Sequence, residues 1–290
     1  MHSSFLLLML AIAVVWRWQW QSPTGGSWQA RWQSALAAFC LPPLMVVLAA
    51  GTVLYMGHHG TMMGWSVSPM GCWASRGILG LLGGVGIYAL GQAVKTEWWL
   101  QQQPMVSLPT GGQARCLDID LPVAALVGVT SSSLLVSRGW LEQLTLAEQQ
   151  AMVAHEQAHG DCGDPLWFLG LGIIHRFASW WPNNQALWEE LLLLREIRAD
   201  QRAAITHDPL LLAELLVSLC RQMALLNQGS PADLAPYLGF NESLCPSRLE
   251  QRVNALLDPE VTAAPSTLRL SPLPWLIAAS LPLAAPWFHT

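Results

Sequence analysis

Two histidines stand four residues apart in the stretch His155-Glu156-Gln157-Ala158-His159. Residues at this spacing share one face of a helix, so His155 and His159 can offer two imidazole nitrogens to one metal ion. Glu156 lies beside that face and can reach a water molecule bound to the metal. Two neutral imidazoles with an open coordination position suit a catalytic zinc ion. The alternative is a chance match on an ordinary helix, expected about one time in a hundred for a chain of this length.

The segments around the motif predict the helix that it requires. Residues Thr145–Glu148 form a capping box, in which the threonine caps the first free amides and the glutamate reaches back. We expect the helix to run through His159 and to end at Gly160, because a residue without a side chain permits a left-handed turn. Met152 and Val153 are available to pack inward.

A third ligand is offered by a later helix, expected from about Gln185 to Ala204. Glu196 and Asp200 lie four apart on one of its faces. Glu196 completes the set of two histidines and one glutamate used by a large class of zinc hydrolases. Asp200 can accept a hydrogen bond from the outer nitrogen of a liganding histidine, which fixes its tautomer. The alternative is a solvated charged face in which the two carboxylates pair with the neighbouring arginines, Arg195 and Arg198.

The composition indicates a membrane protein with a modest soluble part. Of 290 residues, 52% are hydrophobic and only 11% are charged, against about 25% charged in a typical soluble domain. The net charge of -5 makes direct binding to nucleic acid unexpected. The six cysteines form no CxxC pair, and we expect reduced thiols, neither a disulfide framework nor a zinc knuckle.

Four apolar runs are candidates for transmembrane helices: residues 5–20, 35–57, 77–94 and 273–288. In the first run Arg17 can snorkel to the interface. A signal peptide is the alternative for this run, although the positive start and the small-residue cleavage site are unconvincing. The last run contains three prolines, which make it an awkward span.

These runs define three parts of the chain. Residues 1–100 form a membrane domain with three spans, residues 101–272 form the domain that carries the metal motif, and residues 273–290 form a fourth membrane segment. Arginines flank the first loop, and Lys95 follows the third run. By the positive-inside rule the amino terminus is outside and the metal-binding domain is cytoplasmic.

A small sheet is expected before the motif helix. Residues 101–113 have the composition of a linker, and three runs with β-type composition follow, at 115–120, 125–130 and 133–137. An edge strand near the metal helix could hold an extended peptide by β-augmentation. Buried structural strands are the alternative.

Further helices are expected after the motif. Asp164-Pro165 predicts the cap and first residue of an apolar helix that ends near Trp181, before the break at 182–184. Later helices are predicted over 209–227 and 247–257. A donor for an oxyanion could come from one of four residues, among which the sequence does not choose: His207, Tyr237, Arg248 and Arg252.

The order of these parts resembles the BlaR/MecR-type membrane metallopeptidases, and the related HtpX and CAAX-prenyl-protease group is the next match. The resemblance covers roughly residues 75–257, and its specific part is H-E-x-x-H together with Glu196 and Asp200. It implies a mainly α integral membrane protein with about four transmembrane helices. It also implies an α+β, gluzincin-like zinc metallopeptidase domain with a small sheet.

The resemblance assigns a role to each site residue. It implies one Zn²⁺ per chain held by His155, His159 and Glu196, with Glu156 activating water and Asp200 behind the ligands. The chain ends just after the last apolar run, where β-lactam-sensing transducers have a large external domain with a nucleophilic serine. Antibiotic sensing by this chain is therefore not expected.

The function expected from the sequence is a membrane-embedded zinc endopeptidase that hydrolyses peptide bonds near the cytoplasmic face of the cell membrane, in regulatory proteolysis. Its partners would be a protein or peptide substrate, the lipid bilayer, and a repressor or other regulatory protein. A non-catalytic signalling or scaffold protein that retains the fold is the alternative. A purely structural zinc site is less favoured, because such sites usually close all four positions, often with cysteine; Cys162 is near in sequence but follows the helix-ending glycine.

Overall fold

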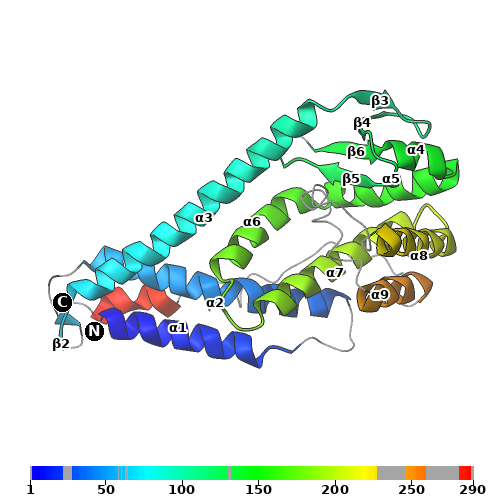
Figure 1. The fold of residues 1–290 in the computed structure, drawn as a ribbon. Helices are drawn as coiled ribbons and strands as arrows, with labels where there is room; N and C mark the ends of the chain where they lie inside the picture. Colours follow the sequence, from blue (N-terminus) through cyan, green and yellow to red (C-terminus); the bar gives the residue numbers. More distant parts are fainter. Residues whose placement is uncertain are drawn as a thin grey trace. The chain divides into compact units, whose positions relative to one another are not determined.

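The structure is a computed structural model that describes residues 2–21, 28–57, 59, 61–62, 65–129, 132–226, 246–258 and 281–288. It is mostly helical, with a small mixed sheet (Figure 1). The chain divides into two compact units. We call the first the helical unit (Met1–Gly91, Gly170–Leu191 and Thr267–Thr290) and the second the sheet unit (Gln92–Leu169 and Leu192–Ser266).

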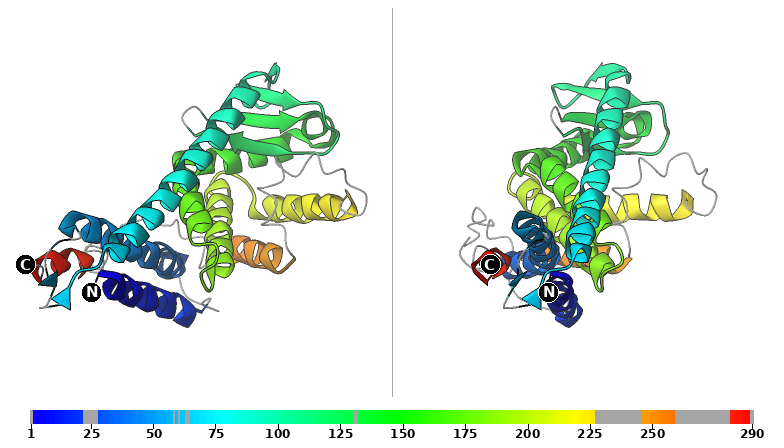
Figure 2. Two further views of the ribbon diagram at one scale, coloured as in Figure 1. Left: turned by 60° about the vertical axis from the view of Figure 1, so that its left-hand side comes forward. Right: turned by 90° about the vertical axis from the view of Figure 1, so that its left-hand side faces the viewer.

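Three helices among the described residues are long and apolar enough to cross a membrane: α1 (His2–Gln19), α2 (Trp28–Met56) and α3 (Pro69–Gln101). They contain the first three expected apolar runs and are candidate spans, and α2 and α3 extend past the apolar runs into polar residues. Helices α1 and α2 lie side by side (Figures 1 and 2). A short strand pair, β1 (Thr61–Met62) with β2 (Trp65–Ser66), precedes α3.

The fourth expected span is not established. Residues 273–280 of that run lie outside the described residues, and Leu281–Phe288 forms a 3₁₀ helix, η3, with Pro286 inside it. The described part of the chain therefore contains three candidate spans where about four were expected.

Arg17, at the end of α1, is fully buried and does not snorkel to an interface. Its Nη2 donates a hydrogen bond to Asn184 Oδ1 at 3.1 Å, and its guanidinium lies over the rings of Phe39 and Trp181. The Asn183 amide donates to the carbonyl of Arg17 at 2.7 Å, which satisfies a carbonyl at the end of the helix. These contacts attach the end of α1 to the turn before α7.

The sheet unit contains a four-stranded sheet in the order β3-β4-β6-β5 (Figure 1). Its strands are β3 (Met105–Ser107), β4 (Gln113–Leu117), β5 (Ala124–Val127) and β6 (Ser133–Ser137). Strands β4 and β6 are parallel, and the other neighbours are antiparallel. The expected small sheet is confirmed, with one strand more than the sequence predicted.

Strand β3 lies in the stretch that the sequence predicted to be a linker. The turn that joins it to β4 contains Gly111 and Gly112 at φ values of 92° and 88°. Such left-handed conformations suit glycine because it has no Cβ to clash. Leu108 N–H donates to the Gly112 carbonyl at 3.1 Å and closes the turn. The glycines that resembled a linker therefore form a hairpin turn.

Helices α4 (Arg138–Gln143) and α5 (Leu146–Asp161) follow the sheet and pack on it. The expected inward packing of Met152 and Val153 is confirmed, since both lie against the buried cluster of Leu108, Ala114, Val136 and Trp140. Burial of this apolar surface is the main force that holds α5 against the sheet.

The start of α5 is as predicted, but its end is not. Thr145 Oγ1 accepts a hydrogen bond from Glu148 N–H, and Glu148 Oε2 accepts one from Thr145 N–H at 2.7 Å, which confirms the capping box. Gly160 lies inside the helix, and the left-handed glycine is Gly163, at φ 66°. A Cβ at position 160 would lie 3.1 Å from Leu126 Cδ2, so this glycine permits close packing against β5.

Four further helices complete the described chain: α6 (Asp164–Phe177), α7 (Asn184–Ala203), α8 (Pro209–Leu226) and α9 (Pro246–Leu257). The α6 helix ends before the expected Trp181. Helices α5, α7, α8 and α9 pack together in the sheet unit through a buried cluster of Ala151, Ala203, Leu212, Ala213 and Leu256. This cluster fixes α7 and α9 beside the motif helix.

Candidate metal centre

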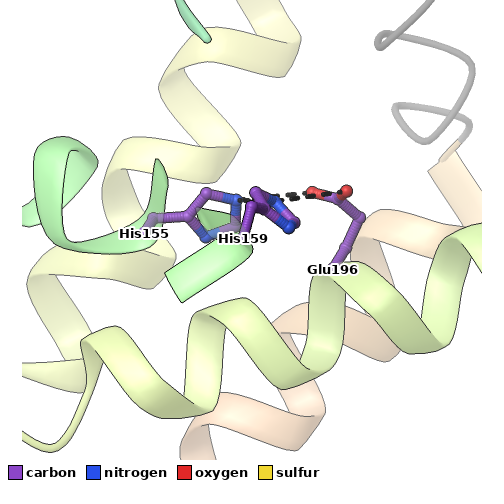
Figure 3. A group of neighbouring side chains, drawn as sticks. All are labelled: His155, His159 and Glu196. Atoms are coloured by element: carbon purple, nitrogen blue, oxygen red, sulfur yellow. Dashed lines mark hydrogen bonds and ion pairs between the residues drawn. The ribbon is translucent and has the colours of Figure 1, made fainter. Parts of the chain in front are cut away.

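The three residues predicted as metal ligands lie together (Figure 3). Nε2 of His155 lies 3.2 Å from Nε2 of His159 and 3.4 Å from Oε2 of Glu196. Nε2 of His159 lies 3.7 Å from Oε1 of Glu196. Ligand bonds of about 2.0–2.1 Å at tetrahedral angles place donor atoms about 3.3 Å apart. The two imidazole nitrogens therefore have the spacing that a tetrahedral zinc ion requires, and each of them faces a different oxygen of Glu196.

His155 is held from behind by Asp200, as the sequence predicted. Its Nδ1 lies 2.9 Å from Asp200 Oδ1. An ionised carboxylate only accepts hydrogen bonds, so Nδ1 carries a hydrogen, and Nε2 is the nitrogen that can bind a metal once its own proton is displaced. Asp200 is 1% exposed, and it accepts two hydrogen bonds from Arg252, at 2.7 and 2.8 Å.

His159 is held in the same way by a residue that the sequence placed in another role. Its Nδ1 lies 2.7 Å from Asp164 Oδ2, and Arg198 Nη2 donates to Asp164 Oδ1. The prediction that Asp164 caps α6 is wrong: it is the first residue of α6, and its side chain turns to the histidine. Aspartate before proline is so typical of a helix start that this pattern concealed the second role.

Each histidine is thus the end of a chain of imidazole, carboxylate and guanidinium. All members of the two chains are buried or nearly so, and Glu196 and its neighbour Arg195 are each 6% exposed. The face on α7 is therefore not solvated, although the pair of Glu196 with Arg195 that this alternative included is present. Sequence reasoning missed Asp164 and Arg198 as supports of the site, and it considered Arg252 only as an oxyanion donor.

Glu196 lies between two arginines. Nε and Nη2 of Arg195 donate to its Oε1 at 2.9 and 2.7 Å, and Nη1 of Arg252 lies 3.4 Å from its Oε2. The Arg195 guanidinium also lies over the ring of Phe168. Burial by itself would raise the pKa of Glu196, but the charges of Arg195, His159 and Arg252 hold that pKa well below the usual value. Glu196 is therefore an anion throughout the neutral range and can bind a cation.

The other titratable groups show the same competition between burial and charge. Burial would lower the pKa of His155, but hydrogen bonds to Asp200 and Glu196 outweigh it and raise the pKa to about 10 in the metal-free protein. Burial would raise the pKa of Asp200 and of Asp164. The charge of Arg252 outweighs burial at Asp200 and lowers its pKa below the usual value. The hydrogen bond from His159 and the charge of Arg198 do the same for the pKa of Asp164. Two carboxylates, those of Asp200 and Glu196, thus face His155, where a metal cation can replace its proton.

Glu156 is partly buried on α5 and lies against β5. Its Oε2 accepts a hydrogen bond from Leu126 N–H at 2.8 Å, and its charge acts on Arg252. It is not a member of the metal-ligating group. Glu156 directly follows His155 in the sequence, but its carboxylate lies at the edge of the sheet.

Strand β5 has an edge that pairs with no other strand among the described residues. Ser137 N–H donates to the Val123 carbonyl at 2.9 Å, just before the strand. Because antiparallel pairs alternate, the backbone groups of Ala125 face β6, while those of Ala124 and Leu126 face the other edge. The bond from Leu126 N–H to Glu156 lies on that outer edge.

Three further oxyanion candidates were predicted from the sequence: His207, Tyr237 and Arg248. His207 Nδ1 lies 2.9 Å from Thr206 Oγ1 in the turn after α7, and Tyr237 lies outside the described residues. Arg248 is buried on α9. Cys162 is a free thiol at the end of α5 and does not join the metal-ligating group, and Cys40, Cys72 and Cys116 are free thiols too, as expected.

Arg252, the fourth oxyanion candidate, contacts the ligand Glu196 and also Asp200, which lies behind His155. Its Nε and Nη2 are bound to Asp200, and its Nη1 faces Glu196. Through these contacts Arg252 supports the residues of the metal centre. These contacts do not assign an oxyanion donor.

Comparisons with known proteins add no assignment to this geometry. No protein-family model, no curated protein and no solved structure matches the chain. The resemblance in the order of the motifs thus stays an expectation, and a function can be argued only from the metal-ligating group and the residues around it.

Proposed function

We propose that the protein is a membrane-embedded, zinc-dependent endopeptidase that hydrolyses peptide bonds of a protein substrate near the cytoplasmic face of the cell membrane. The observation that carries the proposal is the group of His155, His159 and Glu196, whose ligand atoms all lie within 4.8 Å of one another. The proposal agrees with the resemblance to the BlaR/MecR-type metallopeptidases.

The chemistry of the donor set favours a catalytic zinc ion. Two imidazoles and one carboxylate suit zinc, and three protein ligands leave a fourth position for water. A structural site would usually fill that position with a further side chain, often cysteine. In the described part of the chain no fourth ligand joins the group.

Hydrolysis of a peptide bond needs activation of a water molecule and transfer of its proton. A bound zinc ion lowers the pKa of water and polarises a carbonyl group. Glu156 accepts the proton of the attacking water and passes it to the leaving amine. The hydrogen bond from Leu126 N–H to its Oε2 fixes the orientation of this carboxylate at the edge of the sheet.

A peptide is the class of substrate that fits the outer edge of β5. An extended chain that pairs there would use the backbone groups of Ala124 and the carbonyl of Leu126, and it would lie beside Glu156. Backbone pairing gives affinity for many sequences, so this edge supports an endopeptidase with a protein substrate. A regulatory protein such as a repressor is one such substrate.

The position at the membrane rests on the three candidate spans. The arginines of the first loop and Lys95 at the end of α3 favour a cytoplasmic side for the residues that follow. Cleavage is therefore expected at substrates near the inner face of the membrane.

A non-catalytic membrane scaffold is the second candidate, and one observation favours it. The Glu156 carboxylate binds a backbone amide of β5, so this residue has a structural use that does not require catalysis. The substitution Glu156→Gln separates the two candidates, because glutamine keeps an oxygen that can accept from Leu126 N–H but cannot act as a base.

The test compares cells that carry the full-length wild-type chain, Glu156→Gln or the control Glu142→Gln. Glu142 lies on α4 and its side chain is 66% exposed. We expect about one zinc per purified chain in all three, and proteomic cleavage products in the wild type and the control alone. Zinc bound in full with cleavage that does not depend on Glu156 would reject the peptidase proposal in favour of the scaffold.

A further inference from the structure

Arg252 contacts two carboxylates of the metal centre, those of Asp200 and Glu196. It lies on α9, 52 residues after Asp200, and it is 3% exposed. We infer that Arg252 is a positioning residue: it orients Asp200, and through it His155, while it holds the second oxygen of Glu196. The inference rests on the proposed zinc site and names a residue on which that site depends.

The contacts with Asp200 are bidentate. Arg252 Nε donates to Oδ2 at 2.7 Å and Nη2 donates to Oδ1 at 2.8 Å. Oδ1 also accepts from His155 Nδ1 at 2.9 Å. Two parallel bonds prevent the carboxylate from rotating, so the oxygen that faces the imidazole stays in place. The ring of His155 consequently keeps its Nε2 directed to the metal position.

The third nitrogen of the same guanidinium reaches a ligand directly. Nη1 of Arg252 lies 3.4 Å from Glu196 Oε2, the oxygen that is 3.4 Å from His155 Nε2. A planar fork can serve Asp200 and Glu196 together, whereas the single ammonium of lysine cannot reproduce this geometry. The chemistry thus calls for arginine at this position, beyond the need for a positive charge.

The buried series of His159, Asp164 and Arg198 can be compared with the series of His155, Asp200 and Arg252. Arg198 donates to Asp164 through Nη2, and Asp164 supports His159. Arg252 makes a bidentate contact with its own carboxylate and, in addition, approaches Glu196. We expect the loss of Arg252 to disturb two ligands, His155 and Glu196.

The position of Arg252 also makes the site depend on α9. Leu256, one turn further along α9, is buried with Ala151 of α5 and Ala203 of α7. Packing of α9 in this cluster brings the guanidinium to the carboxylates. A merely structural role would be neutralisation of buried charge, which would affect stability and leave the geometry at the metal unchanged.

The experiment uses the full-length protein in detergent and measures three quantities for each variant. They are the zinc affinity from chelator competition, the visible absorption of the cobalt-substituted protein, and the melting temperature without metal. The variants are Arg252→Gln, Arg252→Lys, Asp200→Asn and the double variant of Arg252→Gln with Asp200→Asn. Arg138→Gln is the control, because Arg138 also pairs with two carboxylates, Asp118 and Asp120, but on the surface.

We expect Arg252→Gln to weaken zinc binding about 10- to 100-fold and to alter the cobalt spectrum, as changes behind metal ligands do. Arg252→Lys should recover part of the affinity. The double variant should lose no more than the more damaging of its two single changes, because both act through the same hydrogen bonds. The control should bind zinc as the wild type does.

Several results would overturn the inference. They are wild-type affinity and spectrum in Arg252→Gln, or losses that add in the double variant. If Arg252→Gln does not fold, a folded Arg252→Lys with full affinity and an unchanged spectrum also overturns it. A wild-type protein that binds no zinc would be a different failure, since it removes the proposed zinc site itself.

Discussion

His159 Nδ1 lies 2.7 Å from Oδ2 of Asp164, across the turn that ends the motif helix. Gly163, at φ 66°, reverses the chain between them. The ligand and its support therefore come from consecutive helices joined by a left-handed glycine. This relationship makes the turn after α5 part of the metal centre.

The first prediction concerns Asp164. Replacement by asparagine removes the charge that faces His159 and Arg198, so we expect zinc affinity to fall about 10- to 100-fold. Stability should fall by roughly 3 kcal/mol, because a buried guanidinium loses its anionic partner. Chelator competition and chemical denaturation measure the two effects.

Asp118→Asn is the matched control for this change. Asp118 also pairs with an arginine, Arg138, but its side chain is 84% exposed, so its removal should change stability by less than about 1 kcal/mol. Equal effects of the two substitutions on zinc affinity would contradict the role given to Asp164.

The site residues that could be predicted from the sequence are those whose spacing within one helix reveals them. H-E-x-x-H, the capping box and the pair Glu196 and Asp200 all depend on helical periodicity within a few residues, and the structure places each of them as that periodicity requires. Helix geometry depends little on the rest of the fold, so it can be derived before the fold is known.

The residues that the sequence did not predict act across long separations or in two roles. Arg252 reaches Asp200 over 52 residues and Arg198 reaches Asp164 over 34, and no local pattern states which helices will pack together. Strand β3 was missed because a hairpin turn and a flexible linker share the same glycines. Such features depend on tertiary contacts that override local preference.

Removal of zinc should destabilise the protein. Its ligands come from two helices, α5 and α7, so a bound ion stabilises the folded state by an amount that grows with its affinity and concentration. We expect EDTA to lower the melting temperature and zinc to restore it, while magnesium, which prefers oxygen ligands, does not. His155→Ala should melt at one temperature with and without EDTA. A shift in that variant as large as in the wild type would place the ion elsewhere.

The reactivity of Cys162 should depend on pH in a defined direction. Burial raises the pKa of this thiol more than the charges of Arg198 and Arg202 lower it. The folded protein therefore holds less reactive thiolate at pH 8 than the unfolded chain. We expect iodoacetamide to label the Cys162 peptide more slowly in the folded protein, with a rate that rises about tenfold per pH unit below the pKa. Equal rates in folded and denatured protein, measured by peptide mass spectrometry, would contradict this expectation.

The outer edge of β5 gives the sharpest test of how a substrate binds. The backbone N–H of Ala124 faces that edge and that of Ala125 faces β6. Ala124→Pro removes an outward-facing donor that an added strand would use, and proline is tolerated at strand edges where its nitrogen faces outward. With a peptide identified through Glu156-dependent cleavage, we expect KM to rise about tenfold while the zinc content and melting temperature stay near the wild-type values. Ala125→Pro, in contrast, should break the ladder to β6 and lower the melting temperature. A wild-type KM in a folded Ala124→Pro variant would show that substrates do not pair with this edge through that amide.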